Sequence, residues 1–443
     1  MKNKFWAALA IATALMSQTS NAQGLLRDAE IERSLRLIAQ PILNSAGLGG
    51  GSVQILIVND RSMNAFVTGG RNIFVNYGLV TRLETVEELQ AVLAHEIGHI
   101  TGGHISQRAA SAAQARTAAG LGFLLGAAVG AASGEAGAGA GIIAGSASAA
   151  KTGFLTHTRA QETSADQSSL RYLQNAGIDP SAALKVFKLF EGQDLLTAKR
   201  RDPYAQTHPL TAQRMATVRS FVAAYKPRPS KQAAKADYWY ARMRAKFIAF
   251  TGNPKSVLRK VGTTDNSEIA IYTRAIAYHF KPDPKNAGRE IAKLLRKWPN
   301  DPYYNELNGQ FLLETGNAAG AVKAYRRASQ LAPQESLILA GLGRAQNAVG
   351  DHKGSLRTLK SAYAKDPRDG RMLRELAVAY AKNKQNGWAS LVTAERYALR
   401  GNFKLAATHA NRAQSLLPAG STGWLKAQDI IIQAKKIGSK KRR

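Results

Sequence analysis

The pattern of apolar and polar residues changes along the chain, and the predicted elements change with it. Residues 51–60 form a short β-branched run that ends in turn residues, so we expect a strand there. Residues 64–76 contain two strand-like pieces around a Gly-Gly pair, which is the pattern of a hairpin. From Thr85 the apolar residues recur with a helical period, and Thr85 with Glu88 predicts a capping box at the start of that helix.

The second half of the chain is predicted to be helical and repetitive. Three prolines recur at intervals of 34 residues: Pro299, Pro333 and Pro367. Gly309 and Gly343 occupy equivalent positions of successive units, and a further unit that ends at Pro418 is displaced by 51 residues, which predicts about one extra helix. A 34-residue period with small residues at helix crossings and a proline after each second helix is the tetratricopeptide pattern. We therefore expect a linker and an α-solenoid over residues 227–443, with a basic concave face.

The N-terminus predicts export. A basic start, an apolar run over residues 5–16 and small residues before the cleavage position indicate a Sec-type signal peptide over residues 1–22, cut near Ala22. The run is too short to act as a stop-transfer helix, and an uncleaved anchor is the alternative. Because the chain contains no cysteine, we expect no disulfides and a fold that depends on packing.

The charge of the chain limits its partners. The formal net charge is +31, and residues 251–443 contain 34 Lys and Arg against 14 Asp and Glu. A basic balance usually suggests nucleic acid, but an exported protein meets little of it, so we predict no nucleic-acid partner. Anionic lipid headgroups, acidic envelope polymers or acidic proteins fit better. A generally basic proteome is the alternative explanation.

The stretch LQAVLAHEIGHITGGH, residues 89–104, carries the candidate chemistry. His95 and His99 are four residues apart, so their imidazoles project from one face of the helix and can share a tetrahedral zinc ion. Glu96 lies about 100° further round the helix, beside such a metal, as in the H-E-x-x-H helix of metallopeptidases. Because this short motif also occurs by chance, a histidine pair on an amphipathic helix is the alternative.

A third ligand has to come from elsewhere. On a continuous helix His104 lies about 180° from His95, so we do not expect it to bind this metal. Glu162 and Asp166 are four residues apart on one face of a later predicted helix. We predict that Glu162 completes the metal site and that Asp166 accepts an N–H from a ligating histidine. A solvent-facing acidic pair is the alternative.

These motifs match a known family. The stretches NAFVTGGRNIFVNYGLV, AHEIGHITGGH and TRAQETSAD resemble the gluzincin peptidases that include the CAAX prenyl proteases and the HtpX membrane peptidases. With a signal peptide and C-terminal repeats, the chain is most similar to the periplasmic members. The resemblance implies one Zn²⁺ per chain, held by His95, His99 and Glu162. It also makes Glu96 the general base and Asp166 the support of the ligands.

Two further segments acquire an interpretation from this resemblance. THPLTAQRM, residues 207–215, resembles the family's H-P-x-x-x-x-R element, in which His208 either hydrogen-bonds the oxyanion or plugs the open metal position. A helix-cap histidine, with Arg214 in a structural ion pair, is the alternative. The Ala-, Gly- and Ser-rich residues 109–150 stand in place of a membrane-facing segment. We expect a helical hairpin or loop over the active site that could touch lipid, or else a disordered insert.

The predicted protein is therefore mainly α. An α/β gluzincin-like metallopeptidase domain with a small hairpin and sheet spans residues 23–226, and the repeat solenoid follows. We expect a periplasmic endopeptidase that cleaves misfolded or stalled outer-membrane proteins by attack of a zinc-bound water, with Glu96 transferring the proton.

Two features would govern its partners. The substrate would add as a strand beside Asn64, Ala65 and Phe66. The repeats would contact unfolded envelope proteins or an outer-membrane assembly machinery. The alternative function is a chaperone or assembly scaffold that uses the repeats and whose peptidase is normally shut.

Overall fold

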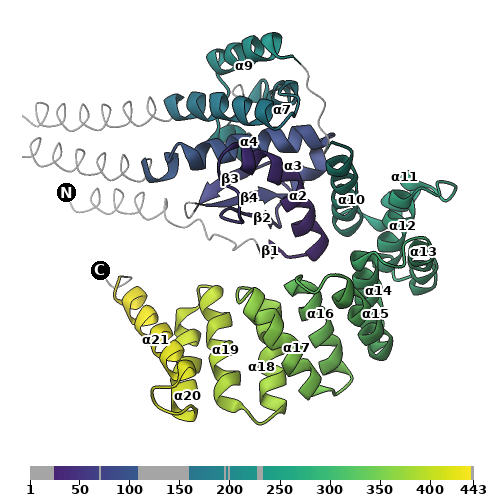
Figure 1. Cartoon of the computed structure of the whole chain (residues 1–443), viewed down its shortest axis with the longest axis vertical. Coiled ribbons are helices and arrows are strands. Elements are labelled where there is room, and N and C mark those ends of the chain that lie inside the picture. Colours follow the sequence, from purple (N-terminus) through teal and green to yellow (C-terminus); the bar gives the residue numbers. More distant parts are fainter. Residues whose placement is uncertain are drawn as a thin grey trace, which may run out of the picture. The chain divides into compact units, whose positions relative to one another are not determined.

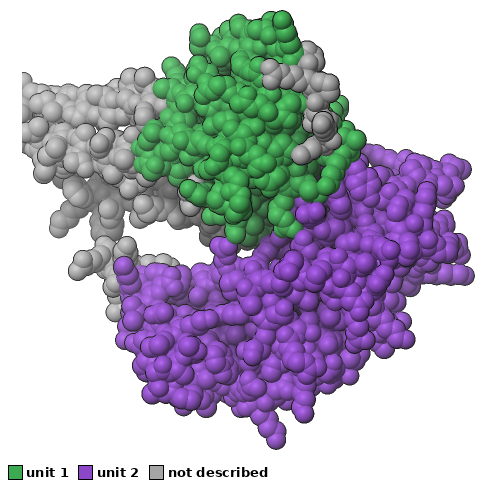
Figure 2. Space-filling view, viewed as in Figure 1, with its two compact units in different colours: residues 1–26, 35–237 green, residues 27–34, 238–443 purple. Residues whose placement is uncertain are grey.

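The computed structural model describes residues 24–68, 71–107, 159–193, 196–197, 200–226 and 233–440 (Figure 1). The predicted signal peptide and the insert of residues 109–150 lie outside the described residues. Two compact units are distinguished in Figure 2: unit 1 comprises residues 1–26 and 35–237, and unit 2 comprises residues 27–34 and 238–443. In the described ranges, no helix combines the length and the apolar character needed to cross a bilayer.

Unit 1 contains a small sheet and helices around it. The strands are β1 (Leu25–Leu26), β2 (Gln54–Val58), β3 (Ala65–Thr68) and β4 (Asn72–Asn76). The helices are α2 (Ala29–Ser45), whose first residues belong to unit 2, α3 (Tyr77–Arg82), α4 (Val86–Thr101), α7 (Ser181–Phe190), α8 (Pro203–Thr207), α9 (Ala212–Ala224) and a helix that includes residues 159–175.

The sheet has the order β1-β2-β4-β3, with β2 parallel to β4 and β3 antiparallel to β4. The predicted strand is confirmed, and the two predicted pieces of the hairpin pair as antiparallel strands, while the Gly-Gly pair between them lies outside the described residues. Alternate residues of β4, Ile73 and Val75, are fully buried, which fixes the register because a shift by one residue would turn them to the other face. Strand β3 lies at the edge of the sheet and contacts α4.

Helix α4 begins with the predicted capping box, in which the Thr85 side chain accepts the N–H of Glu88 and the Glu88 carboxylate bonds the cap backbone. The helix is buried over most of its length, which anchors the residues of the motif rigidly. At Gly98 it crosses the helix that includes residues 159–175. A Cβ atom at Gly98 would lie 2.8 Å from the carbonyl oxygen of Ala165. Glycine therefore permits the close crossing that brings Glu162 to the histidines.

Unit 2 is a succession of paired helices (Figure 1). They are α10 (Ala233–Thr251), which starts within unit 1, α11 (Pro254–Val261), α12 (Glu268–Phe280), α13 (Pro284–Lys297), α14 (Pro302–Glu314), α15 (Ala318–Leu331), α16 (Ser336–Ala348), α17 (His352–Lys365), α18 (Gly370–Lys382), α19 (Asn386–Leu399), α20 (Phe403–Leu416) and α21 (Thr422–Lys440).

The predicted repeats are confirmed in detail. The three prolines spaced by 34 residues follow the ends of α13, α15 and α17, and α18, α19 and α20 lie between Pro367 and Pro418, which supplies the extra helix. At the crossing of α14 and α15, a Cβ atom on Gly309 would meet the Tyr325 ring at 2.7 Å. In the next unit, a Cβ atom on Gly343 would meet Leu359 at 2.4 Å. Glycine is thus needed at both crossings.

A buried ionic cluster lies inside unit 2. Arg242, which is fully buried, donates to Glu30 Oε1 at 2.6 Å and to Asp301 Oδ2 at 2.6 Å. Lys246 Nζ lies 3.1 Å from Glu30 Oε2, and the Tyr272 hydroxyl also donates to that carboxylate. Burial alone would raise the pKa of Glu30, but the two cations hold it below its ordinary value. Residues 27–34 are therefore held in unit 2 by charge-assisted hydrogen bonds.

Candidate metal centre and active site

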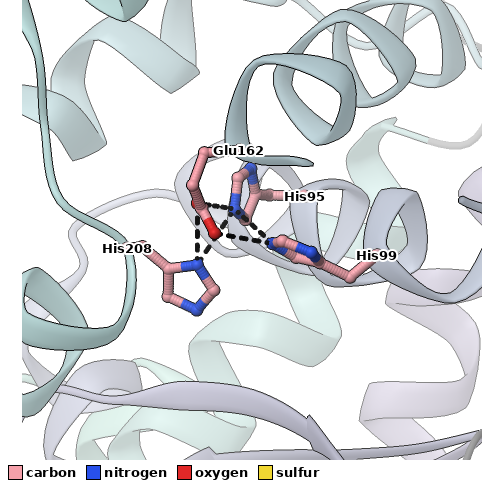
Figure 3. A group of neighbouring side chains, drawn as sticks. All are labelled: His95, His99, Glu162 and His208. Atoms are coloured by element: carbon pink, nitrogen blue, oxygen red, sulfur yellow. Dashed lines mark hydrogen bonds and ion pairs between the residues drawn. The ribbon is translucent and has the colours of Figure 1, made fainter. Parts of the chain in front are cut away.

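Three side chains from two helices converge on one point (Figure 3). Helix α4 supplies His95 and His99, one turn apart, and the helix that includes residues 159–175 supplies Glu162. The two Nε2 atoms are 3.1 Å apart. His95 Nε2 lies 3.2 Å from Glu162 Oε2, and His99 Nε2 lies 3.5 Å from Glu162 Oε1. All three side chains are buried, so this convergence excludes bulk water from their polar atoms.

The spacing of these donors fits a metal ion. Ligands at about 2.0–2.1 Å from a tetrahedral zinc ion are separated from one another by about 3.3 Å. The two imidazole nitrogens are 3.1 Å apart, and each lies near one oxygen of the Glu162 carboxylate, His95 at 3.2 Å from Oε2 and His99 at 3.5 Å from Oε1, so these distances bracket that value. Two imidazole nitrogens and a carboxylate oxygen also form a donor set that zinc accepts in peptidases. The residues present therefore fit a divalent metal, with one corner of the tetrahedron left for other groups.

The imidazole of His208 lies beside this donor set. It follows α8, and its Nδ1 atom is 3.3 Å from His95 Nε2 and 3.0 Å from Glu162 Oε2. Its other nitrogen, Nε2, is 3.4 Å from Glu96 Oε1. The ring thus lies between the metal ligands and the glutamate of the H-E-x-x-H motif.

Asp166 and Arg214 form a support behind the ligands. Asp166 Oδ1 lies 3.0 Å from Nδ1 of His95, so it can accept the N–H of that nitrogen and orient the ring with Nε2 toward the metal position. Arg214 binds the same carboxylate with two hydrogen bonds, of 2.6 and 2.8 Å. It also donates to the carbonyl of Pro209 at 2.8 Å. The Arg214 guanidinium therefore forms an ion pair with Asp166 and also connects the backbone beside His208 to the helix that carries Asp166.

The buried charges shift the pKa values of these groups in opposite directions. Burial favours neutral His95, but Asp166 and Glu162 outweigh it and raise the pKa of His95 to about 9. Burial lowers the pKa of His99 to about 3. Burial opposes the ionisation of Glu162, yet its histidine neighbours hold its pKa far below the ordinary range. A metal ion would therefore compete with a proton at His95 and meet a neutral imidazole at His99.

Glu96 is fully buried, one residue after the first ligand. Its carboxylate faces His208, and Tyr204 packs against the His208 ring. The Tyr204 ring is buried and lies 4.7 Å from the His208 ring, measured between centroids. The Tyr204 backbone N–H donates to the carbonyl of Met63 at 3.2 Å. Sequence reasoning missed Tyr204, whose only signal is an aromatic residue four positions before His208.

The predicted substrate strand lies at the sheet edge. Ala65 and Phe66 belong to β3 and pair with Val75 and Phe74 of β4, while Asn64 lies just before the strand. The carbonyl of Asn64 accepts the N–H of Asn76 at 2.9 Å. No other strand among the described residues pairs with the outer side of β3.

His104 does not follow the continuous helix that sequence reasoning assumed. Helix α4 ends at Thr101, Gly103 adopts a left-handed φ of 64°, and a new helical segment starts at residue 104. The side chain of His104 consequently folds back, and its Nδ1 lies 2.9 Å from Nδ1 of His99. His104 is buried and contacts the outer edge of a ligand ring. The paired glycines before it were the signal that the helix is interrupted.

Comparisons with known proteins identify relatives of this chain. Residues 26–222 match the model of peptidase family M48. The β-barrel assembly-enhancing protease of Yersinia pestis is 23% identical over 397 residues, which cover 87% of this chain and 80% of that protein. The protein of the same name from Escherichia coli is 23% identical and covers 91% and 83%. The mitochondrial metalloendopeptidase OMA1 of Schizosaccharomyces pombe is 24% identical over 196 residues, 42% of this chain and 51% of that protein.

The OMA1 match is limited to less than half of this chain, whereas the two assembly-enhancing proteases match across most of it. The resemblance inferred from the H-E-x-x-H helix and its later acidic pair is confirmed by these matches. Residues 26–222 carry a peptidase family M48 domain, and the chain is a metalloprotease.

Proposed function

We propose that the chain is a zinc-dependent endopeptidase of the cell envelope that cleaves misfolded or stalled outer-membrane proteins. The observation that carries this proposal is the set of three donors at tetrahedral spacing, contributed by His95, His99 and Glu162, with Glu96 buried next to them. The names of the Yersinia and Escherichia relatives support a role in the assembly of β-barrel proteins. The predicted signal peptide supports a periplasmic location.

Each residue has a distinct chemical task in this proposal. Zinc held by the three donors would polarise the scissile carbonyl and make a water molecule at the centre more acidic. Glu96 accepts the proton from the attacking water and returns it to the leaving amine. Asp166 keeps the His95 ring oriented, and Arg214 fixes Asp166. Burial of all these groups excludes competing water and strengthens their interactions.

The substrate backbone would bind at the open edge of the sheet. An extended segment pairing with β3 uses main-chain hydrogen bonds, which give affinity with little demand on sequence. Low sequence specificity suits an enzyme whose substrates are misfolded proteins without a common sequence motif. Selection would come from the repeats of unit 2, which could engage unfolded envelope proteins or an outer-membrane assembly machinery. We propose that nucleic acid is not a partner. We also propose peripheral contact with anionic lipid through the basic surface.

Metal removal tests the proposed function directly. We expect the purified full-length chain to hold one zinc ion per molecule and to cleave an unfolded substrate such as casein. Treatment with a chelator should abolish cleavage, and one equivalent of Zn²⁺ should restore it, because the ligands define a single site. Metal content is measured by atomic absorption alongside the cleavage rate. A chain that binds no zinc, or that cleaves equally well without it, would refute the proposal.

One observation favours a second function, a chaperone or assembly scaffold with a normally shut peptidase. The His208 ring lies between the donor set and Glu96, so it would compete with a water molecule or a substrate carbonyl for the space between them. We therefore favour the plug over the oxyanion role for His208. In this closed form the repeats would carry most of the activity, and substrate or partner binding would have to displace the α8 segment.

Replacement of His208 separates the two roles. We expect His208→Ala to keep its zinc, since three ligands remain. If about ten closed molecules are present for each open one, removal of the ring should raise basal casein cleavage about tenfold. Initial rates at equal zinc occupancy provide the measurement. Thr207→Ala, at the neighbouring exposed position, serves as the control. A drop in cleavage by His208→Ala would instead assign the imidazole to oxyanion stabilisation.

A further inference from the structure

The buried histidine His104 has no part in the site described so far, yet it contacts a ligand. Its Nδ1 atom lies 2.9 Å from Nδ1 of His99, and the two rings meet nearly edge to face, with an interplanar angle of 78°. The other nitrogen of His99, Nε2, faces His95 and Glu162. His99 therefore has one nitrogen toward the metal position and the other toward His104.

This arrangement determines where the protons lie. An imidazole that binds a metal through Nε2 carries its proton on Nδ1, and the partner of that N–H fixes the tautomer and the ring orientation. At His95 the partner is the carboxylate of Asp166. At His99 the neighbouring atom is Nδ1 of His104, at 2.9 Å, which accepts that proton when the His104 ring is neutral and carries its own hydrogen on Nε2. The acceptor at His99 is thus a neutral ring and adds no negative charge to the site.

The chain is built locally to place this ring. A Cβ atom at Gly102 would lie 2.3 Å from His104 Nε2 and 2.7 Å from Cε1, so only glycine leaves space for the imidazole. Gly103 has a φ of 64°, in the left-handed region that glycine adopts without strain. Gly103 therefore permits the turn that returns His104 to His99, and Gly102 leaves the space that the imidazole fills.

We propose that His104 is a positioning residue of the metal centre: its Nδ1 accepts the hydrogen bond from Nδ1 of His99 and holds that ligand in its metal-binding tautomer. The inference rests on the proposed function only in that His99 binds a metal. A buried histidine that merely fills space would satisfy the same packing, but it would not require an acceptor atom at this position.

A pair of substitutions of nearly equal size distinguishes these roles. His104→Asn retains an acceptor, because the amide oxygen can take the position of Nδ1, whereas His104→Leu fills the space without one. Full-length variants are compared for Zn²⁺ affinity by competition with a chromophoric chelator, and for the visible absorption spectrum of the Co²⁺-substituted protein. We expect His104→Leu to lose about 10–100-fold in metal affinity and to alter the Co²⁺ spectrum. His104→Asn should stay within a few-fold of the wild type and keep the spectrum.

Gly102→Ala provides an independent approach, because it leaves His104 in the chain but displaces its ring. We expect this variant to lose metal affinity as His104→Leu does, while Gly288→Ala, where a Cβ atom meets nothing within 4 Å, should behave as the wild type. If His104→Leu does not fold, as judged by circular dichroism, His104→Phe replaces it in the comparison with His104→Asn.

The outcomes separate this inference from the function beneath it. Equal metal affinity and equal Co²⁺ spectra for the Asn and Leu variants and the wild type would overturn the role of His104 and leave the enzyme proposal intact. A wild-type chain that binds no metal would overturn both.

Discussion

Glu96→Gln is expected to abolish peptidase activity while the protein keeps its metal. The glutamine side chain has nearly the same size and leaves His95, His99 and Glu162 unchanged, but it cannot accept a proton from the attacking water. Since a positioned general base contributes about 10²–10⁴-fold to a rate, we expect kcat for casein cleavage to fall by that factor. Zinc content by atomic absorption should remain at one per chain.

A control for this substitution lies on the same helix. Glu87→Gln makes the same chemical change in the first turn of α4, away from the cluster, and should leave the cleavage rate unchanged. If Glu96→Gln cleaves as fast as Glu87→Gln, Glu96 is not the base. Loss of zinc from Glu96→Gln would instead show that the carboxylate helps to bind the metal.

Arg242→Met is expected to produce the largest loss of stability. The substitution removes the hydrogen bonds to Glu30 and Asp301 and leaves the Glu30 carboxylate, which is fully buried, with one cation fewer. Breaking a buried ion pair from one side costs about 3–5 kcal/mol, because the remaining charge stays in a poorly solvated environment. We therefore expect the free energy of unfolding of unit 2 to fall by that amount.

Chemical denaturation followed by tryptophan fluorescence measures this change, since Trp239, Trp298, Trp388 and Trp424 all lie in unit 2. Arg374→Met is the matched control, because Arg374 is 55% exposed in its pair with Glu375, and such pairs contribute at most about 1 kcal/mol. The double variant Arg242→Met with Glu30→Leu should recover part of the loss. Equal midpoints for Arg242→Met and Arg374→Met would exclude a stabilising role for the buried cluster.

The side chains that converge in the candidate metal centre could be predicted from the sequence because their signals are local. Four-residue spacing places His95 beside His99, and it places Glu162 beside Asp166, whichever way the helices pack. The assumption that the two pairs meet was supported by the family resemblance. The structure adds the reason: Gly98 lets the two helices cross closely enough for Glu162 to reach both rings.

Other parts of the site could not be read from the sequence. The helical period placed His104 on the far side of α4, because nothing in the period accounts for the turn at Gly102 and Gly103. The choice between a plug, an oxyanion donor and a cap for His208 depends on where a loop more than a hundred residues after α4 comes to lie. Arg214 likewise acquires its ion pair with Asp166 only through packing of α9.

By itself, the sequence determined the capped H-E-x-x-H helix, the hairpin before it, the acidic pair and the 34-residue repeat with its extra helix. Each of these depends on the backbone period, on a cap or on a glycine or proline within a few residues, so the information is local. Only the tertiary structure decided that the His208 ring faces Glu96 and that Glu30 is held by Arg242. Those contacts join residues 112 and 212 positions apart, and their energy comes from burial and charge pairing that no short stretch of sequence contains.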